Sequence, residues 1–440
     1  MFLRSVFLCM FAIACCLCCE KDEQLSQLVP KYLDTAKPLL SQTNFEVKNG
    51  KQNNHDVISA TAQPNDIFYM FTGDTQIIWE CTPRNLDCKT KARDMCQEEG
   101  YEESCLKFEE GLYSNLAQMI SMKALIQCLD SQGNKPRGLI INGDLTAYGH
   151  DLELRRFCTM WHDPIDGVPI YPGLGNHDYA NNIHGCGDLG SSGECAIRML
   201  QYLNATMKEH HPHIKLDVST SETMEYENTN SGVQPKVVKQ HTGSMAYSWD
   251  ECGDASTHTN CIHFVQLNNY PSYNVLIHKF GEDEPTYHVK TVNIWLEKDL
   301  ANTTYPVVIN FHDIDDHFDM MQKKTAFWQI LNDSGRNILG IFFAHRHGSV
   351  GWRMGANWCI NGKGAHTMYS GSVPNNKYSL VHFSNGTIKG CPHTDCYWLG
   401  NRYSEDTMNR YNDKNYGDRC LEDRKTNLSF IYRQAKDEKC

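Results

Sequence analysis

Short apolar runs in the middle of the chain end abruptly in polar or glycine-containing sequence, which is the pattern of buried strands. Six such runs stand out, at residues 67–71, 139–141, 168–171, 262–267, 307–311 and 338–343. Helical spacing of apolar residues separates several of them, around residues 112–126, 294–300 and 326–331. Strands that alternate with helices predict an α/β fold, in which functional side chains gather where the strands end.

Two long stretches interrupt this alternation, a cysteine-containing insert at residues 79–105 and a polar region at residues 186–242. We expect both to form loops over the site or elaborations tied by disulfides. Further on, Asn385-Gly386 lies between two apolar runs, and this dipeptide is a strong signal for a β-hairpin.

The N-terminus has the layout of a cleaved secretory signal, with Arg4, an apolar stretch at residues 6–17 and charged residues at 20–23. The stretch is short for a membrane span, which needs about 20 apolar residues, and no later stretch approaches that length. We therefore predict a signal peptide at 1–19, a polar leader at 20–64, one large domain at 65–390 and a cysteine-containing extension at 391–440. The expected location is outside the cell or in the lumen of the secretory pathway.

Cysteine usage agrees with this compartment, since the chain has 20 cysteines and those beyond residue 20 are scattered rather than grouped in tight pairs. Disulfides are expected, although the pairing cannot be read from sequence. The same route would expose five Asn-x-Ser/Thr sites to glycosylation, at Asn204, Asn302, Asn332, Asn385 and Asn427.

The net charge is −12, and the chain has no run of Lys or Arg. This balance argues against a protein that binds a nucleic-acid backbone, because such proteins carry basic patches. An anionic substrate would have to find its positive charge elsewhere, and bound metal ions are the obvious source.

Five short segments carry the chemistry of a metal site, each directly after a predicted strand: residues 73–76 (GDTQ), 143–144 (GD), 175–178 (GNHD), 311–313 (FHD) and 344–348 (AHRHG). Carboxylate, amide and imidazole groups are ligands for divalent cations, and two neighbouring cations need one shared ligand. Asp144 is the candidate for this bridging role. A lone Gly-Asp is most often a turn and a lone His-x-His is often only a polar strand face, so the prediction depends on all five occurring together in this order.

These segments resemble the five signature blocks of the calcineurin-like metallophosphoesterases, over roughly residues 67–389. The resemblance implies a metallophosphoesterase-type β-sandwich flanked by helices, with the ligands at the C-terminal ends of strands. It also implies two metal ions, divalent or of mixed valence, with Mn, Fe, Zn and Mg all left open. The implied ligands of the first ion are Asp74, Asp144 and His347, and those of the second are Asp144, Asn176, His312 and His345.

His177 resembles the catalytic histidine of the family, which contacts the phosphoryl group. Its ring would be oriented by Asp178 or by a backbone carbonyl. The implied reaction is hydrolysis of a phosphate mono- or diester by a metal-bridging hydroxide, with His177 stabilising charge or protonating the leaving oxygen.

The chain departs from the family pattern at two positions. Ala344 replaces the usual glycine before the His-x-His pair, and a methyl group there should be tolerated. Gln76 replaces the histidine of the first block, so we expect a weak ligand whose amide oxygen suits Mn²⁺ better than Zn²⁺. Tyr148 does not fit the spacing of the tyrosine ligand in purple acid phosphatases and is assigned to packing or substrate contact.

Two readings of function remain. The first is a secreted phosphoesterase that acts on a small phosphate ester, such as a nucleotide or a phospholipid head group. The second is a secreted, non-catalytic binding protein in which the change at Gln76 has emptied one metal site. The sequence does not indicate an oligomeric state, and a serine or cysteine hydrolase is not supported because no G-x-S-x-G motif follows a strand.

Overall fold

The computed structural model describes residues 65–77, separate positions within 115–131, and residues 133–180, 193–229, 232–277, 286–314, 326–347, 349–352, 358–361, 363–375, 377–390 and 393–395. The predicted signal peptide, leader and cysteine-containing insert lie outside these residues, as does the extension at 391–440 apart from 393–395. None of the helices in the described ranges is both long and apolar enough to cross a membrane.

One of two large sheets contains the first strands of the domain, in the order β17-β16-β1-β2-β3, with β18 also paired to β16. The strands are β1 (Ile67–Thr72), β2 (Gly138–Ile141), β3 (Ile170–Pro172), β16 (Lys377–Ser384), β17 (Thr387–Gly390) and β18 (His393–Asp395). Strands β1, β2 and β3 are parallel, whereas β16 runs antiparallel to β1.

The second large sheet has the order β13-β15-β12-β11-β8-β7-β4, with β14 also paired to β15. Its strands are β4 (Lys215–Leu216), β7 (Tyr247–Asp254), β8 (Thr259–Gln266), β11 (Val307–Asn310), β12 (Ile338–Phe343), β13 (Val350–Trp352), β14 (Trp358–Ile360) and β15 (Lys363–Ser370). The four central strands β15, β12, β11 and β8 are parallel to one another.

Aromatic side chains join the two sheets into a sandwich. Tyr69 on β1 lies 4.3 Å from Phe264 on β8 between ring centroids, and Phe71 stacks on Phe342 of β12 at 4.1 Å. All four side chains are fully buried. Aromatic burial of this kind contributes several kcal/mol to the stability of a core, so these contacts fix how the two sheets face each other.

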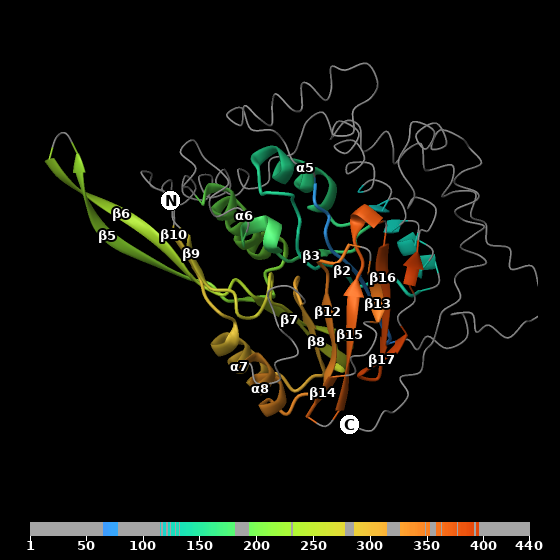
Figure 1. The fold of residues 1–440 in the computed structure, drawn as a ribbon. Helices are drawn as coiled ribbons and strands as arrows, with labels where there is room; N and C mark the ends of the chain where they lie inside the picture. Colours follow the sequence, from blue (N-terminus) through green and yellow to red (C-terminus); the bar gives the residue numbers. More distant parts are fainter. Residues whose placement is uncertain are drawn as a thin grey trace, which may run out of the picture.

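Helices cover the outer faces of the sandwich, as Figure 1 shows. Helices α7 (Asn293–Ala301) and α8 (Ala326–Asp333) pack Leu296 and Phe327 into one cluster with Ile309 of the second sheet. Helices α5 (Asp151–Trp161) and α6 (Glu194–His210) pack their apolar faces into the cluster that contains the first sheet. The mixed α/β architecture predicted from sequence is therefore confirmed.

Most elements lie where the apolar pattern placed them. Strands cover or overlap all six predicted runs, and β3 starts two residues later than expected. The hairpin at Asn385-Gly386 is also confirmed, since both residues adopt the positive φ angles, 50° and 65°, that such a turn requires.

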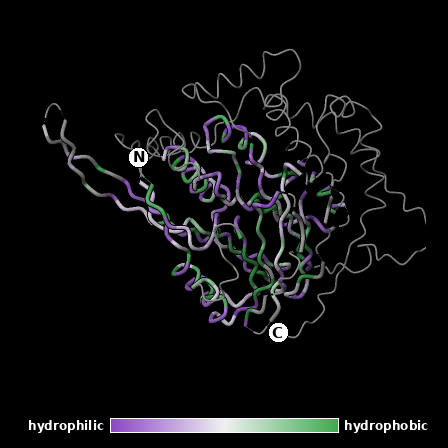
Figure 2. Tube along the Cα trace, viewed as in Figure 1, coloured by the Kyte–Doolittle hydropathy of each residue, from purple (hydrophilic) through white to green (hydrophobic). Residues whose placement is uncertain are grey.

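Of the two alternatives predicted for residues 186–242, loops or an elaboration tied by disulfides, the described residues do not form loops, and Cys195 among them is disulfide-bonded. They form α6 and a long antiparallel pair, β5 (Ser219–Thr229) and β6 (Gly232–Gly243), which joins β10 (Thr286–Val289) and β9 (Val275–Ile277) in a third sheet. This sheet projects away from the sandwich (Figure 1). Strands β5 and β6 are rich in Thr, Ser, Glu and Lys, and Figure 2 shows pale and hydrophilic colours along most of their length, so the apolar signal of a strand is weak there.

The ends of the parallel strands from both large sheets meet at one edge of the sandwich, and the closest approach is between Gly73 and Ala344. A Cβ atom added to Gly73 would collide with the Cβ of Ala344, and it would also lie 3.2 Å from the carbonyl oxygen of Asn142. The methyl group of Ala344 is thus accommodated because the residue opposite has no side chain.

This contact gives a test of the sandwich geometry. Gly73→Ala should lower the free energy of unfolding by about 1–3 kcal/mol, since it overpacks a buried contact. Adding Ala344→Gly should restore much of this loss, because it removes the atom that the new methyl group strikes. Urea unfolding of the wild type, both single variants and the double variant measures the coupling between the two sites. Additive effects would show that the two residues do not touch.

Candidate metal centre

Seven side chains that the sequence singled out as ligands converge at this edge of the sandwich. They follow β1, β2 and β3 in the first sheet and β11 and β12 in the second: Asp74, Gln76, Asp144, Asn176, His312, His345 and His347. Four of them are almost completely buried, and Gln76, His345 and His347 are partly exposed. The inner part of the site is thus buried, and its outer edge is exposed to solvent.

Two groups of potential ligand atoms lie in this cluster, and both contain Asp144. One group consists of Asp144, His312 and His345, and the other of Asp74, Asp144 and His347. Within each group the ligand atoms lie within 4.8 Å of one another. A carboxylate has two oxygen atoms and can therefore serve both groups at once, which is the geometry that a bridging ligand requires.

Asn176 joins the three residues of the first group. The Oδ1 atom of Asn176 lies 2.9 Å from Nε2 of His312 and 3.1 Å from Nδ1 of His345. The same Nε2 lies 3.2 Å from Oδ2 of Asp144. On the far side of the ring, Nδ1 of His312 donates to the carbonyl oxygen of Asn142 at 2.8 Å. This second contact places a proton on Nδ1 and points Nε2 toward the cluster, which is the orientation of metal-binding histidines.

The second group contains a buried carboxylate without hydrogen bonds. Both oxygens of Asp74 are buried and have no hydrogen-bond partner, and Nε2 of His347 lies 3.6 Å from Oδ1. Burying an ionised carboxylate without a partner is very unfavourable, and a coordinated cation removes that cost. The donor set of carboxylate, amide and imidazole groups, together with this carboxylate, fits divalent cations.

Gln76 lies against the shared carboxylate. Its Nε2 atom donates to Oδ2 of Asp144 at 3.1 Å. A 180° rotation of the amide group would instead turn the carbonyl oxygen toward the cluster, so this position can either support Asp144 or offer a neutral oxygen ligand. The structure therefore brings Gln76 to the site, at the place that the sequence assigned to it.

The protein groups alone leave this cluster short of positive charge. Burial raises the pKa of Asp74 well above its usual value, and the charge of Asp144 raises it further. Burial also opposes ionisation of Asp144, but the adjacent His312 outweighs it and lowers the pKa of Asp144 to about 2. The same attraction overcomes the effect of burial on His312 and raises its pKa to about 10. Among the described residues, no Lys or Arg forms an ion pair with Asp74 or Asp144.

His177 lies beside Asp144, and its backbone N–H donates to Oδ1 of that carboxylate at 2.9 Å. Its Nδ1 atom lies 2.8 Å from the carbonyl oxygen of Ala147. Of the two possible orienting groups, the backbone carbonyl is thus the one in contact, and in the neutral ring Nε2 carries the lone pair.

Asp178 binds the backbone of the site rather than orienting the ring of His177. Its carboxylate accepts hydrogen bonds from the backbone N–H groups of Leu145, Thr146 and Gly175, at 3.0, 2.9 and 2.8 Å. These bonds tie the loop after β2 to the loop after β3. Asp178 therefore holds Asp144 and Asn176 in their relative positions.

The backbone of the site is strained at several candidate ligands. Asp74, Gln76, Asp144 and His345 have positive φ angles of 49°, 34°, 53° and 67°. Residues with a side chain adopt this region at a cost of about 1–3 kcal/mol each, and such residues cluster at functional sites. The sharp turns after the strands aim these side chains back over the ends of the sheets.

A buried polar network beneath the site was not identified from the sequence. Asn142 donates through Nδ2 to Oγ of Ser370 at 2.7 Å and accepts from Nε2 of Gln266 at 3.0 Å. All three side chains are fully buried, and they connect the ends of β2, β15 and β8. The backbone carbonyl oxygen of Asn142 also accepts the hydrogen bond from Nδ1 of His312. The sequence did contain a signal for this network, because polar residues lie at the ends of otherwise apolar strands.

Tyr148 borders the site but belongs to neither group of potential ligands. Its ring lies edge-on to the ring of His177, with centroids 5.7 Å apart, and it is partly exposed. The neighbouring Tyr179 is instead buried in the core.

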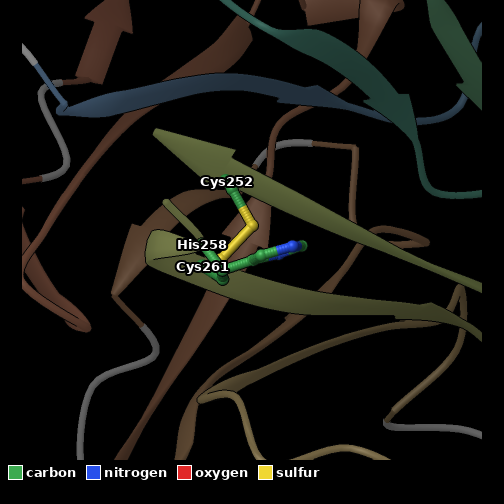
Figure 3. A group of neighbouring side chains, drawn as sticks. All are labelled: Cys252, His258 and Cys261. Atoms are coloured by element: carbon green, nitrogen blue, oxygen red, sulfur yellow. A yellow bond between two sulfur atoms is a disulfide. The ribbon is translucent and has the colours of Figure 1, made fainter. Parts of the chain in front are cut away.

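A third group of potential ligands lies on the β7–β8 hairpin and has another explanation. Cys252 and Cys261 face each other across the two strands and form a disulfide, which Figure 3 shows beside His258. Since both sulfurs are used in this bond, the group is a covalent cross-link between strands. Cys158 and Cys195 each take part in a disulfide as well.

Two solved structures match the chain at low similarity: "GAP50 the anchor in the inner membrane complex of Plasmodium" (8% identity, TM-score 0.34) and the calcineurin-like phosphoesterase YfkN from Bacillus subtilis (13% identity, TM-score 0.33). The first match covers 75% of this chain and 84% of that chain, and the second covers 81% and 99%. Among curated proteins, none matches the chain significantly.

The family model for calcineurin-like phosphoesterases matches residues 69–349. This range includes the seven converging side chains and His177, and it spans more than half of the chain. The chain therefore belongs to the calcineurin-like phosphoesterase family.

Proposed function

We propose that this protein is a secreted phosphoesterase that uses two metal ions to hydrolyse a small phosphate mono- or diester. The observation that carries the proposal is the convergence of two groups of ligand atoms on Asp144, next to the buried carboxylate of Asp74, which lies 3.6 Å from Nε2 of His347. Asp74, Asp144 and His347, assisted by Gln76, would hold one cation. Asp144, Asn176, His312 and His345 would hold the other.

A pair of cations held there supplies positive charge for the phosphoryl oxygens and Lewis acidity that activates a water near neutral pH. The chain itself contributes orientation and proton transfer. Asn142 and Asp178 fix the ligand loops through their hydrogen bonds. His177, oriented by the carbonyl of Ala147, stabilises charge on the phosphoryl group or protonates the leaving oxygen.

Secretion is proposed from several independent features. The N-terminal sequence has the layout of a signal peptide, and the Cys252–Cys261 disulfide suits an oxidising compartment. Of the candidate glycosylation sites, Asn302, Asn332 and Asn385 have exposed side chains. Asn204 lies inside helix α6 and is a poor acceptor.

The direct test is to strip the purified protein with a chelator, reload it separately with Mn²⁺, Mg²⁺, Zn²⁺ or Fe²⁺, and assay aryl phosphate monoesters and diesters, nucleotides and phospholipids. A phosphoesterase hydrolyses at least one ester class with one of these metals. Metal binding without hydrolysis of any class would favour the non-catalytic binding protein, in which the scaffold is kept and the chemistry is lost.

Asp144→Ala should reduce bound metal from about two ions per chain to fewer than one and should abolish hydrolysis, since it removes the only carboxylate common to both groups. Elemental analysis after dialysis, together with the assay above, measures both effects. Asp333→Ala, which removes an exposed carboxylate at the end of α8, is the matched control and should change neither. Two ions retained by Asp144→Ala would rule out the bridging role.

His177→Ala should lower kcat by about 10²-fold or more while metal content stays unchanged. If the ring protonates the leaving oxygen, the loss is larger for alkyl phosphates than for p-nitrophenyl phosphate, whose leaving group needs no proton. If the ring stabilises charge, the two losses are equal. His213→Ala, at an exposed position, is the control, and wild-type turnover in His177→Ala would remove this residue from the mechanism.

Gln76→His should tighten the first cation site and shift metal preference from Mn²⁺ or Mg²⁺ toward Zn²⁺ or Fe²⁺, because imidazole suits these ions better than an amide does. Activity and bound metal are titrated against each metal for both proteins after chelation. Gln127→His, at an exposed position, controls for adventitious binding by a new histidine. Identical preferences in the wild type and Gln76→His would show that residue 76 only supports Asp144.

A further inference from the structure

Strands β5 and β6 form a two-stranded arm, defined here as residues 219–229 and 232–243. They pair antiparallel along their whole length, from Ser219 opposite Thr242 to Thr229 opposite Gly232. Strand β10 pairs with β6 only over the base, from Gln240 to Gly243. Beyond that base the arm has no neighbouring strand among the described residues, and Figure 1 shows it extending away from the sandwich and helices.

The base of the arm is held by one face of its sheet. Ile277, Tyr287 and Val289 lie on this face in register with one another, and all three are buried in the core. The ring of His241 on β6 stacks on Tyr287 with centroids 4.7 Å apart. This contact marks where the buried part of the face ends.

The same face continues outward along the arm as exposed apolar surface. Alternation along β6 and the register with β5 place two further cross-strand pairs on it, Met224 with Val237 and Tyr226 with Pro235. Met224, Tyr226 and Val237 are 64%, 70% and 51% exposed, and Pro235 is exposed as well. We call these four residues the arm patch.

Such a surface is unusual for a strand pair on its own. An isolated two-stranded hairpin is marginally stable in water, and an exposed apolar face on a hairpin with free edges favours association. The side of the sheet that faces the core at the base therefore continues beyond the core. Another molecule would have to cover the exposed apolar residues.

Oppositely charged side chains also lie on the arm. In the sequence β5 carries three glutamates and no Lys or Arg, whereas β6 carries two lysines and no acidic residue. On the face of the arm patch, Glu222 and Lys239 form a cross-strand pair at 3.8 Å, with side chains 62% and 60% exposed. The face of the arm patch thus carries one acidic and one basic side chain, Glu222 and Lys239, and the four apolar residues lie between this pair and the tip.

We propose that the arm patch is the contact surface of a homodimer, in which two copies of the chain pack their arms face to face about a two-fold axis along the arms. This symmetry lays β5 of each copy over β6 of the other. Met224 then faces Val237 of the second copy, Tyr226 faces its Pro235, and Glu222 faces its Lys239. The surface is self-complementary in shape and charge, as a two-fold interface requires.

The size of the contact sets its strength. The exposed part of the arm presents a face about 27 Å long and about 10 Å wide, well below the roughly 800 Å² per partner of a stable interface. The arms alone would therefore give a dimer that dissociates on dilution. Sedimentation velocity across about 1–200 µM protein should show a reversible monomer–dimer equilibrium, as for weak interfaces of this size.

A charge-reversal pair tests the arrangement in the full-length protein. Glu222→Lys gives each copy two positive charges on this face, and Lys239→Glu gives two negative charges. Each variant alone should be monomeric at concentrations where the wild type dimerises, because like charges then face each other across the axis. Mixed in equal amounts, the two variants should form a heterodimer, because each positive residue now faces a negative one.

Recovery on mixing separates this interface from a local effect on the hairpin, since a misfolded arm would not regain association. Ser221→Lys is the control because Ser221 is exposed on the opposite face of the arm, and it should leave dimerisation unchanged. Tyr226→Glu should abolish the dimer. A wild type that is monomeric at all concentrations, or a dimer indifferent to these charges, overturns the proposal. Flotation of the wild type with lipid vesicles, lost in Tyr226→Glu, would also overturn it and assign the patch to a membrane.

Discussion

The meeting of two sets of parallel strand ends at one edge of the sandwich is the constraint on which the site depends. Strands β1 to β3 and strands β11 and β12 end there, held together by stacked aromatic pairs such as Phe71 and Phe342. Because these rings fix the distance between the sheets, the residues after the strands have almost no freedom in position. The close approach of Gly73 and Ala344 shows how little space remains.

Electrostatics explain why this edge is suited to cations rather than to a protein nucleophile. Asp74, Asp144 and Asp178 are buried within one small volume. Asp178 is satisfied by backbone N–H groups and Asp144 by His312 and His177, but Asp74 has no hydrogen bond. The fold thus keeps a carboxylate in a place that is unfavourable for the protein alone. The left-handed backbone at several ligands adds to this free-energy cost. Metal binding would offset the cost, and the donor groups are suited to it.

The projecting arm is also attached to the rest of the molecule by buried apolar side chains. Its inner face belongs to the core at Tyr287 and Ile277 but continues outward to Met224 and Tyr226, where nothing in the described part of the chain covers it. The cation site is built from long-range contacts between strand ends, whereas the arm is built from one local hairpin. The proposed metal chemistry and the proposed association can therefore be tested independently of each other.

The sequence by itself determined the buried strands, the hairpin at Asn385-Gly386 and the set of polar residues that meet at the site. These features are local. A buried strand has an apolar run, and a polar residue directly after that run lies at the end of the strand. The sequence did not reveal α6 or the strands of the arm, because the arm alternates polar residues and its apolar positions are few. Nor did it reveal the pairing of Asn142 with Ser370 and Gln266, or the choice of Ala147 over Asp178 as the group that orients His177. Those contacts join residues far apart in the chain or depend on the direction of a single ring, so only the packing of the two sheets decided them.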